Sequence, residues 1–344
     1  MNIDVYEKNQ KRKWYLIFGI TIFSLLSALV FMTIFTNVSV FSIPDVIYRF
    51  MTGGQLTAQE KIIIHMRMPA VLMALVAGIA LSISGAVMQS VTHNDLVSPF
   101  TLGVSSAAAF GASVCIISGS SILHSTVGMI LGAFISSCIC IFLVYSLSAK
   151  IGISASALVL VGISMNYFFS ALSATIQFFA QEYKLGEIIQ WTFGTFSKAD
   201  WKIVGMSSVV LLIAIIIYAF LSLRLDAMAN NDDEMVKSLG IQPERTRMII
   251  GMVAVLLTST IISFTGVIGF IGLIAPHIAR TVIGNEHRTF LPMAAVTGAC
   301  LLLYSDAIGK YILYPVMIPV GIVISFVGVP LFVHLVISMR GRGE

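Results

Sequence analysis

The chain has 344 residues, of which 58% are hydrophobic and only 10% carry a charged side chain, and its formal net charge is +4. About 25% of the residues in a soluble domain are charged, and the surface of such a domain must face water, so this composition excludes a soluble globular protein. The sequence therefore predicts an all-α polytopic membrane protein for which lipid is the main solvent.

The first predicted element is a membrane span that follows a short basic segment. Residues 1–13 are polar and basic, and the run at 14–36 is apolar. A cleavable signal peptide would have a shorter apolar core and a small-residue cleavage motif. We therefore expect a retained first span at 14–36 and a cytoplasmic tail at 1–13.

Further spans are predicted along the rest of the chain, because each membrane helix needs roughly 20 apolar residues. The windows lie at 68–91, 98–118, 122–148, 153–180, 202–223, 246–267, 290–309 and 318–339. A shorter apolar piece at 268–283 contains Pro276, and counting it as a crossing gives about ten transmembrane helices. The polar gaps between spans are short, so we expect a single transmembrane domain over residues 1–344.

The region 68–149 contains one charged residue, Asp95. It is rich in Gly, Ala and Ser, which lets membrane helices pack closely. A polar hinge at Thr92–Pro99 interrupts it, and Ser98 is a suitable N-cap for a helix that begins with proline. The four cysteines all lie within spans, so we interpret them as packing residues and not as a disulfide frame or a metal site.

Within the fifth span, Leu158–Ala180, polar side chains recur along one stripe. They are Asn166, Ser170, Ser173 and Gln177, at positions i, i+4, i+7 and i+11. Because a polar stripe facing lipid would be costly, it faces either a neighbouring helix or a central pathway. Both interpretations stay open.

The positions of Lys and Arg predict the orientation. With a cytoplasmic N-terminus and ten crossings, the inside segments hold Lys8, Lys11, Arg12, Lys13, Lys150, Arg224, Lys237, Arg245, Arg247, Arg280, Arg288, Arg340 and Arg342. The outside segments hold Arg49, Lys61, Arg67, Lys184, Lys198, Lys202 and Lys310. The bias is 13 against 7, so we expect both termini in the cytoplasm.

The segment 226–247 is the longest charged stretch after the N-terminal tail. Asn231 to Glu234 can cap a helix that carries Lys237 and stops at Gly240. Pro243 is then expected to start a second short helix. Two short helices lying at the cytoplasmic face would suit a soluble partner, although a solvated connecting loop is the alternative interpretation.

The sequence offers little for catalysis. It contains no phosphate-binding loop, no HExxH, no CxxC and no GxSxG pattern, and its six histidines are scattered. We therefore expect no catalytic residue, no metal site and no cofactor bound by this chain. Asp306 is the one carboxylate well inside a span, and without a charged partner in the spans we interpret it as a structural group, with a proton relay as the alternative.

Several blocks of this sequence resemble the iron-chelate and vitamin B12 permease family of ABC importers, the FecCD and BtuC type. They are RMPAVLMALVAGIALSISGAVMQSVTHNDLVSPFTLGVSSAAAFGA at 67–112, LVGISMNYFFSAL at 160–172, SLGIQPERTR at 238–247, GVIGFIGLIAPHIARTVIGNEHRTFLP at 266–292, and Asp306 followed by IPVGIVISFVGVPLF at 318–332. The resemblance covers nearly the whole chain, in order.

The resemblance implies a type II ABC importer permease fold of ten spans, with Ile271–Val282 as the short eighth span. It also implies a second permease subunit, two cytoplasmic ATPase subunits that use ATP and Mg, and an extracytoplasmic substrate-binding protein. The bilayer surrounds the assembly, in the inner or cytoplasmic membrane of the cell, and no nucleic acid is involved.

The resemblance also implies site residues. The cytoplasmic ATPase-coupling helices would lie within 226–245, at about Asn231–Gln242, with Asp232, Asp233, Glu234, Lys237, Leu239 and Gly240 as contact positions. Arg67 and Lys310 would dock the binding protein. The sequence departs from the family pattern at Ala70, Asp95 and Asp232, and Lys310 replaces an arginine, which keeps the charge but loses the bidentate fork.

The function implied by the resemblance is ATP-driven import of an iron(III)–siderophore complex, with haem or cobalamin as alternatives. The chain itself would be a permease subunit and not an enzyme. Two other functional classes remain as alternatives. An ion-coupled secondary transporter would need paired charges within the spans, and an intramembrane enzyme would need a facing catalytic pair.

Overall fold

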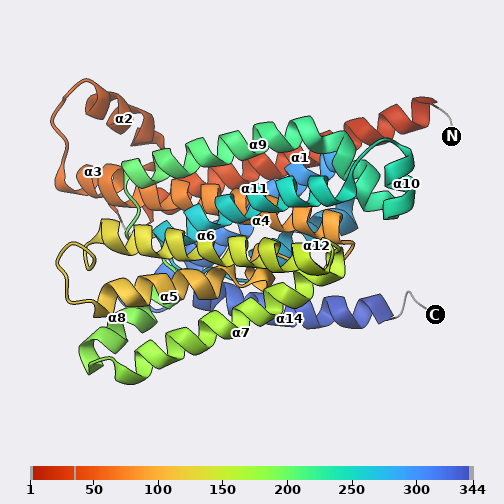
Figure 1. The fold of residues 1–344 in the computed structure, drawn as a ribbon. Coiled ribbons are helices and arrows are strands. Elements are labelled where there is room, and N and C mark those ends of the chain that lie inside the picture. Colours follow the sequence, from red (N-terminus) through yellow and green to blue (C-terminus); the bar gives the residue numbers. More distant parts are fainter. Residues whose placement is uncertain (1–2, 35, 341–344) are drawn as a thin grey trace.

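The computed structural model describes residues 3–34 and 36–340, and its regular elements in these ranges are all helical. Most of the chain forms long helices that run between the two ends of an elongated bundle (Figure 1). The longer helices are α1 (Ile3–Thr33), α4 (Met68–Thr92), α5 (Val104–Ile117), α6 (Thr126–Ile151), α7 (Ala155–Phe179), α9 (Trp201–Asn230), α11 (Pro243–Thr265), α12 (Ile271–Ile283), α13 (His287–Tyr311) and α14 (Val320–Arg340).

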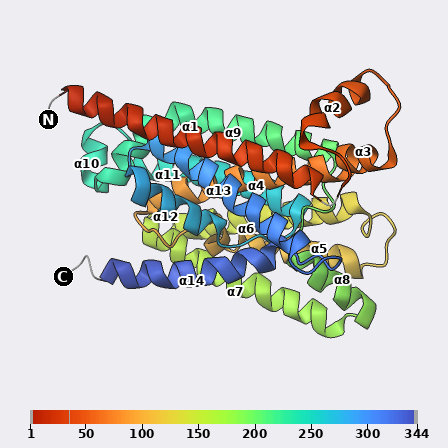
Figure 2. The same cartoon turned by 180° about the vertical axis from the view of Figure 1, so that it is seen from behind.

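Most of the shorter helices lie at the two ends of the bundle. They are η1 (Val40–Ser42), α2 (Ile43–Met51), α3 (Ala58–Ile62), η2 (Ile63–Arg67), α8 (Glu182–Thr192) and α10 (Asp233–Ser238). The short helix η3 (Pro99–Leu102) instead lies within the bundle, before α5. Figures 1 and 2 show α10, the start of α1 and the finish of α14 at one end, here called the α10 end. The opposite end, the α2 end, carries α2, α3 and α8.

The number of crossings agrees with the prediction of about ten. Within the described residues, seven helices have the length and apolar composition to cross a membrane, and three shorter apolar helices, α5, α12 and the first part of α14, bring the total to 7 + 3 = 10. An even number of crossings returns the chain to the end where it began, which is consistent with the shared position of α1 and α14 at the α10 end.

The two shortest membrane helices begin inside the bundle. At 13 residues, α12 is about 20 Å long, which is less than the roughly 30 Å of a hydrocarbon layer. Non-helical residues 266–270 precede it, and the chain turns into α12 at Phe270, which has a φ of +65°. Before α5, Ser98 is the N-cap of η3 as predicted, and its backbone N–H donates to Thr101 Oγ1 at 3.1 Å.

Helix α4 lies at the centre of the bundle and is buried over most of its length. Small residues allow its backbone to approach two neighbours. A Cβ atom added to Gly85 would overlap the carbonyl oxygen of Gly272 on α12, and one added to Gly78 would overlap that of Gly298 on α13. Close approach of this kind increases van der Waals contact where lipid removes the hydrophobic driving force.

Three sequence-based boundaries need correction. The segment assigned to a tail at 1–13 is helical from Ile3 and continuous with the first span. Helix α9 extends to Asn230, so residues 226–230 are not part of a loop. Pro243 does not start a separate short helix, because it is the first residue of α11, which continues to Thr265 without a helix-breaking residue.

Candidate functional sites

Helix α10 is fixed to the bundle by a buried arginine. Arg247 on α11 donates from Nη2 to Asp233 Oδ1 at 2.6 Å and from Nη1 to Oδ2 at 3.1 Å. Its Nε donates to the carbonyl of Val91 on α4 at 2.8 Å, and only 2% of its side chain is exposed. The Arg247 guanidinium binds both the Asp233 carboxylate and the Val91 carbonyl, so it connects the first turn of α10 to α11 and to α4.

The electrostatics of α10 follow from these contacts. The hydrogen bonds from Arg247 hold the pKa of the Asp233 carboxyl below its ordinary value. The hydrogen bond to Glu244, whose Oε1 lies 2.9 Å away, raises the pKa of the Lys237 ammonium. Val236 is fully buried beneath the helix. Asp233 and Val236 thus anchor the inward side of α10.

The opposite side of α10 is open to solvent. Among the residues expected to contact an ATPase, Asp233 is engaged within the chain, whereas the others are exposed, namely Asp232, Glu234, Lys237, Leu239 and Gly240. Asp232 occupies the N-cap position without a side-chain capping bond, and Gly240 follows the helix with a φ of +79°. The exposed set combines carboxylates, an ammonium and an apolar side chain that could meet a soluble partner.

The polar hinge after α4 lies beside α10 and α12. The carboxylate of Asp95 forms an ion pair with Arg280 on α12, and Arg280 Nη2 also donates to Gln89 Oε1 at 3.4 Å. His93 Nε2 lies 3.2 Å from the carbonyl oxygen of Asn231. The single charge in the region 68–149 therefore has an internal partner, which sequence spacing did not indicate.

A second polar cluster that sequence analysis missed joins three helices. His287 Nε2 lies 2.7 Å from Ser90 Oγ on α4, and its Nδ1 lies 2.7 Å from Asp226 Oδ1 on α9. The same Asp226 oxygen accepts the backbone N–H of His287 at 2.9 Å. The side chain of His287 is 1% exposed. The partners are 61 and 197 residues away in the chain, so no local pattern could reveal them.

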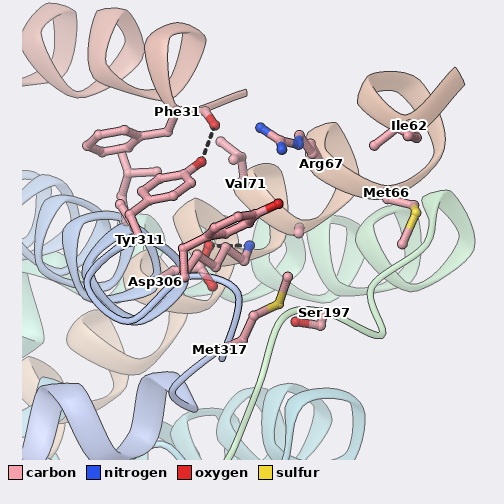
Figure 3. Close-up of a pocket in the computed structure, with 14 residues that line it drawn as sticks. Phe31, Ile62, Met66, Arg67, Val71, Ser197, Asp306, Tyr311 and Met317 are labelled. Carbon is pink, nitrogen blue, oxygen red and sulfur yellow. Dashed lines mark hydrogen bonds and ion pairs between the residues drawn. The ribbon is translucent and has the colours of Figure 1, made fainter. Parts of the chain in front are cut away.

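At the α2 end, both residues expected to dock the binding protein line one cavity of about 220 Å³, together with Asp306 and Tyr311 (Figure 3). Lys310 Nζ donates to Asp306 Oδ2 at 2.6 Å, and the two side chains are 19% and 8% exposed. Arg67 donates to the carbonyl of Ile34, after the first span. The expectation that Asp306 lacks a charged partner is wrong, since α13 extends far enough to include Lys310.

The polar stripe of α7 packs partly against α5. The hydroxyl of Ser106 on α5 donates to Asn166 Oδ1 and accepts from Ser170 Oγ at 3.2 Å. Ser173 is buried and donates to the carbonyl of Phe169, whereas Gln177 is half-buried. Ser170 is nevertheless exposed. The stripe thus has a neighbouring helix on one side and an accessible edge on the other.

Comparison with known proteins gives consistent results. Residues 20–338 match the FecCD transport family. The hemin transport system permease HmuU of Yersinia pestis is 32% identical over 82% of this chain and 85% of its own length. The iron(3+)-hydroxamate import permease FhuG of Bacillus subtilis is 31% identical over 83% of this chain and 86% of its own length.

A solved structure has the same fold. It is described as an inward-facing conformation of a metal-chelate type ABC transporter, and it matches with a TM-score of 0.83 and 29% identity over 94% of this chain and 99% of that chain. The predicted all-α, type II importer permease fold is therefore confirmed. Together with the family match, this similarity shows that the chain is a multi-pass membrane protein and an ABC transporter permease that belongs to the FecCD transport family.

Proposed function

We propose that this chain is the membrane-spanning permease subunit of an ATP-driven importer whose ATP and Mg are used by separate ATPase subunits. The observation that carries the proposal is the way in which α10 is attached to the bundle. Its inward side is clamped through Asp233 and Arg247, and its outward side is exposed. Because packed helices move as units, a displacement of α10 by a docked ATPase would also move α4 and α11.

The orientation in our proposal places the α10 end in the cytoplasm, with both termini there and the protein in the inner or cytoplasmic membrane. The α2 end then faces the extracytoplasmic side, where Arg67 and Lys310 would meet carboxylates of a substrate-binding protein. The excess of Lys and Arg in the segments at the α10 end supports this orientation.

A second permease subunit is proposed to pack against the α7 and α14 side of the bundle. Large apolar side chains are exposed there, including Tyr167 at 74%, Phe178 at 83% and Phe326 at 78%. An open groove of about 700 Å³ next to α14 is lined by Phe193, Phe270 and other residues. Two such faces would enclose a central pathway, with Asn166, Ser170, Ser173 and Gln177 contributing polar groups on the α7 side.

The proposed cargo is an iron(III)–siderophore complex. The names of two relatives specify hemin and iron(3+)-hydroxamate, and the structural neighbour is described as a metal-chelate type transporter. Haem and cobalamin are the alternatives within the same mechanism. All three are large chelates, so the pathway need only accept their size while the binding protein selects among them.

The test of the proposed function is reconstitution of the chain in vesicles with its ATPase and binding protein. Uptake of labelled ferric hydroxamate, haem and cobalamin would be compared, with and without ATP. We expect ATP-dependent uptake of the ferric complex. Uphill uptake by the chain alone, driven by an ion gradient, would instead support the secondary-transporter class. In that case the Asp306–Lys310 pair on α13 would be the candidate intramembrane charge pair.

A separate experiment tests the coupling role of α10. Glu234→Lys reverses a charge on the exposed side of the helix without touching the Arg247 clamp. We expect ATPase subunits to co-purify less and uptake to fall, while the thermal stability of the permease stays unchanged. Glu187→Lys, on α8 at the opposite end, is the matched control. Equal ATPase binding by both variants would reject α10 as the coupling helix.

A further inference from the structure

A groove between α9 and α13 has the polarity of a phospholipid. It holds about 410 Å³, a volume within the range of small-molecule sites. Its walls repeat at helical spacing, with Ile215, Ala219 and Ser222 on α9 and Arg288, Leu291 and Ala295 on α13. Ile83 of α4 also lines it.

The polar and apolar parts of the groove are separated along the bundle axis. The two helices run in opposite directions, and Asp226 on α9 binds His287 on α13, so Ser222 and Arg288 both lie near the α10 end. The apolar members Ile215 and Ala295 lie about two turns deeper, roughly 10 Å along the helices. The groove therefore has a cationic rim and an apolar interior.

Arg288 is available for an anionic ligand. Its side chain is exposed, and no ion-pair partner for it exists among the described residues. Glu286, two residues before Arg288, is engaged with Lys13 at 3.8 Å, and Asp226 is engaged with His287. A phosphate at this position would meet a free guanidinium, which prefers bidentate recognition of phosphate oxygens.

The position of the groove in the bundle indicates that it faces lipid. Helix α9 lies on the opposite side of the bundle from α7 and α14, the side where we place the second permease subunit (Figures 1 and 2). Residues of α9 next to the groove expose large apolar side chains, including Phe220 at 84% and Leu223 at 81%, as expected for a surface in contact with lipid.

We propose that this groove binds one anionic phospholipid from the leaflet at the α10 end, with its phosphate on Arg288 and an acyl chain along Ala219, Leu291 and Ala295. Basic pockets between membrane helices recognise lipid headgroups in this manner. The bound lipid would link α9 to α13 on the lipid-facing side of the His287 cluster, and this role does not depend on the nature of the cargo.

The test uses the purified full chain in nanodiscs that contain phosphatidylcholine and phosphatidylglycerol in equal amounts. Lipids retained after mild detergent extraction are counted by native mass spectrometry. We expect wild-type protein to retain phosphatidylglycerol preferentially. Arg288→Gln should reduce this preference roughly fivefold, the factor for about 1 kcal/mol per basic side chain near the headgroups.

Two further variants make the result specific. Arg224→Gln removes another exposed arginine, on α9, that does not line the groove, and it should leave lipid retention unchanged. Ala219→Leu fills an exposed apolar position in the groove and should displace the lipid while Arg288 remains. Equal losses from Arg288→Gln and Arg224→Gln, or unchanged retention in Ala219→Leu, would overturn the proposal. A change in oligomeric state in Ala219→Leu would identify the groove as a protein interface and overturn it as well.

Discussion

The carboxylate of Asp233 accepts hydrogen bonds from both terminal nitrogens of Arg247, a side chain that is only 2% exposed. The pair joins the short helix α10 to the start of the membrane helix α11. Because a buried guanidinium without a carboxylate partner is costly, the position of α10 is fixed by the same interaction that keeps Arg247 satisfied.

Replacing Asp233 with Asn should therefore destabilise the α10 end. The amide loses the charge that compensates Arg247, and we expect a cost of about 1–3 kcal/mol, moderated because the Asp233 side chain is 39% exposed. Thermal unfolding in detergent measures it. Asp232→Asn, on an exposed neighbour with no such partner, is the control. Equal midpoints for the two variants would contradict the clamp.

The same pair predicts a dependence on pH. Because Arg247 lowers the pKa of Asp233, the stability contributed by this carboxylate is fully present above the ordinary carboxyl range and is lost as the pH falls through the lowered pKa. The difference in melting temperature between wild type and Asp233→Asn should therefore be constant near neutral pH and shrink below about pH 4. A difference that grew in acid would have the wrong sign.

Lys310→Met should destabilise the α2 end of α13. It leaves Asp306, whose side chain is 8% exposed, without its cation, and breaking a buried pair costs about 3–5 kcal/mol. Asp306→Asn in the Lys310→Met background should restore part of the loss, because it removes the uncompensated charge. Thermal unfolding of both single variants and the double variant gives the coupling energy. Additive effects would show that the pair is not coupled.

Gly85→Ala should disturb the packing of α4 against α12. The added methyl group would overlap the carbonyl of Gly272, and overpacking of this kind costs about 1–3 kcal/mol. Gly205→Ala is the matched control, because a Cβ at this exposed position of α9 meets no atom within 4 Å. It should be neutral or slightly stabilising through helix propensity. The expression level and melting temperature of the two variants measure these effects.

Arg67→Glu should weaken docking of the substrate-binding protein at the α2 end, because it reverses the charge proposed to meet carboxylates of that protein. The control is Lys61→Glu, which makes the same charge reversal at an exposed position of α3 whose side chain does not line the cavity. Affinity measured by surface plasmon resonance at low salt should fall more for Arg67→Glu. Unchanged affinity for Arg67→Glu would remove this residue from the docking surface.

Sequence spacing located most helices but not the polar contacts between them. The run of Pro243, Ile250 and Ala254 along one buried face of α11 includes Arg247 at helical spacing, so periodicity could have assigned that arginine to the interior. The polar composition of the segment instead favours the same exposed environment for Arg247 as for Arg245. Local composition cannot distinguish two arginines that lie on different faces of the same helix.

The sequence by itself determined that lipid surrounds this chain and that about ten helices cross the membrane, because hydropathy and helical hydrogen bonding are properties of contiguous segments. The family resemblance was also visible in the sequence, because it rests on contiguous blocks such as 67–112 and 266–292. Only the tertiary structure decided which polar groups meet. Ser90 and His287 are 197 residues apart, and Asp95 and Arg280 are 185 apart. Such pairs depend on how the helices pack in three dimensions, and the spacing of residues along one helix carries no information about the helix that lies beside it.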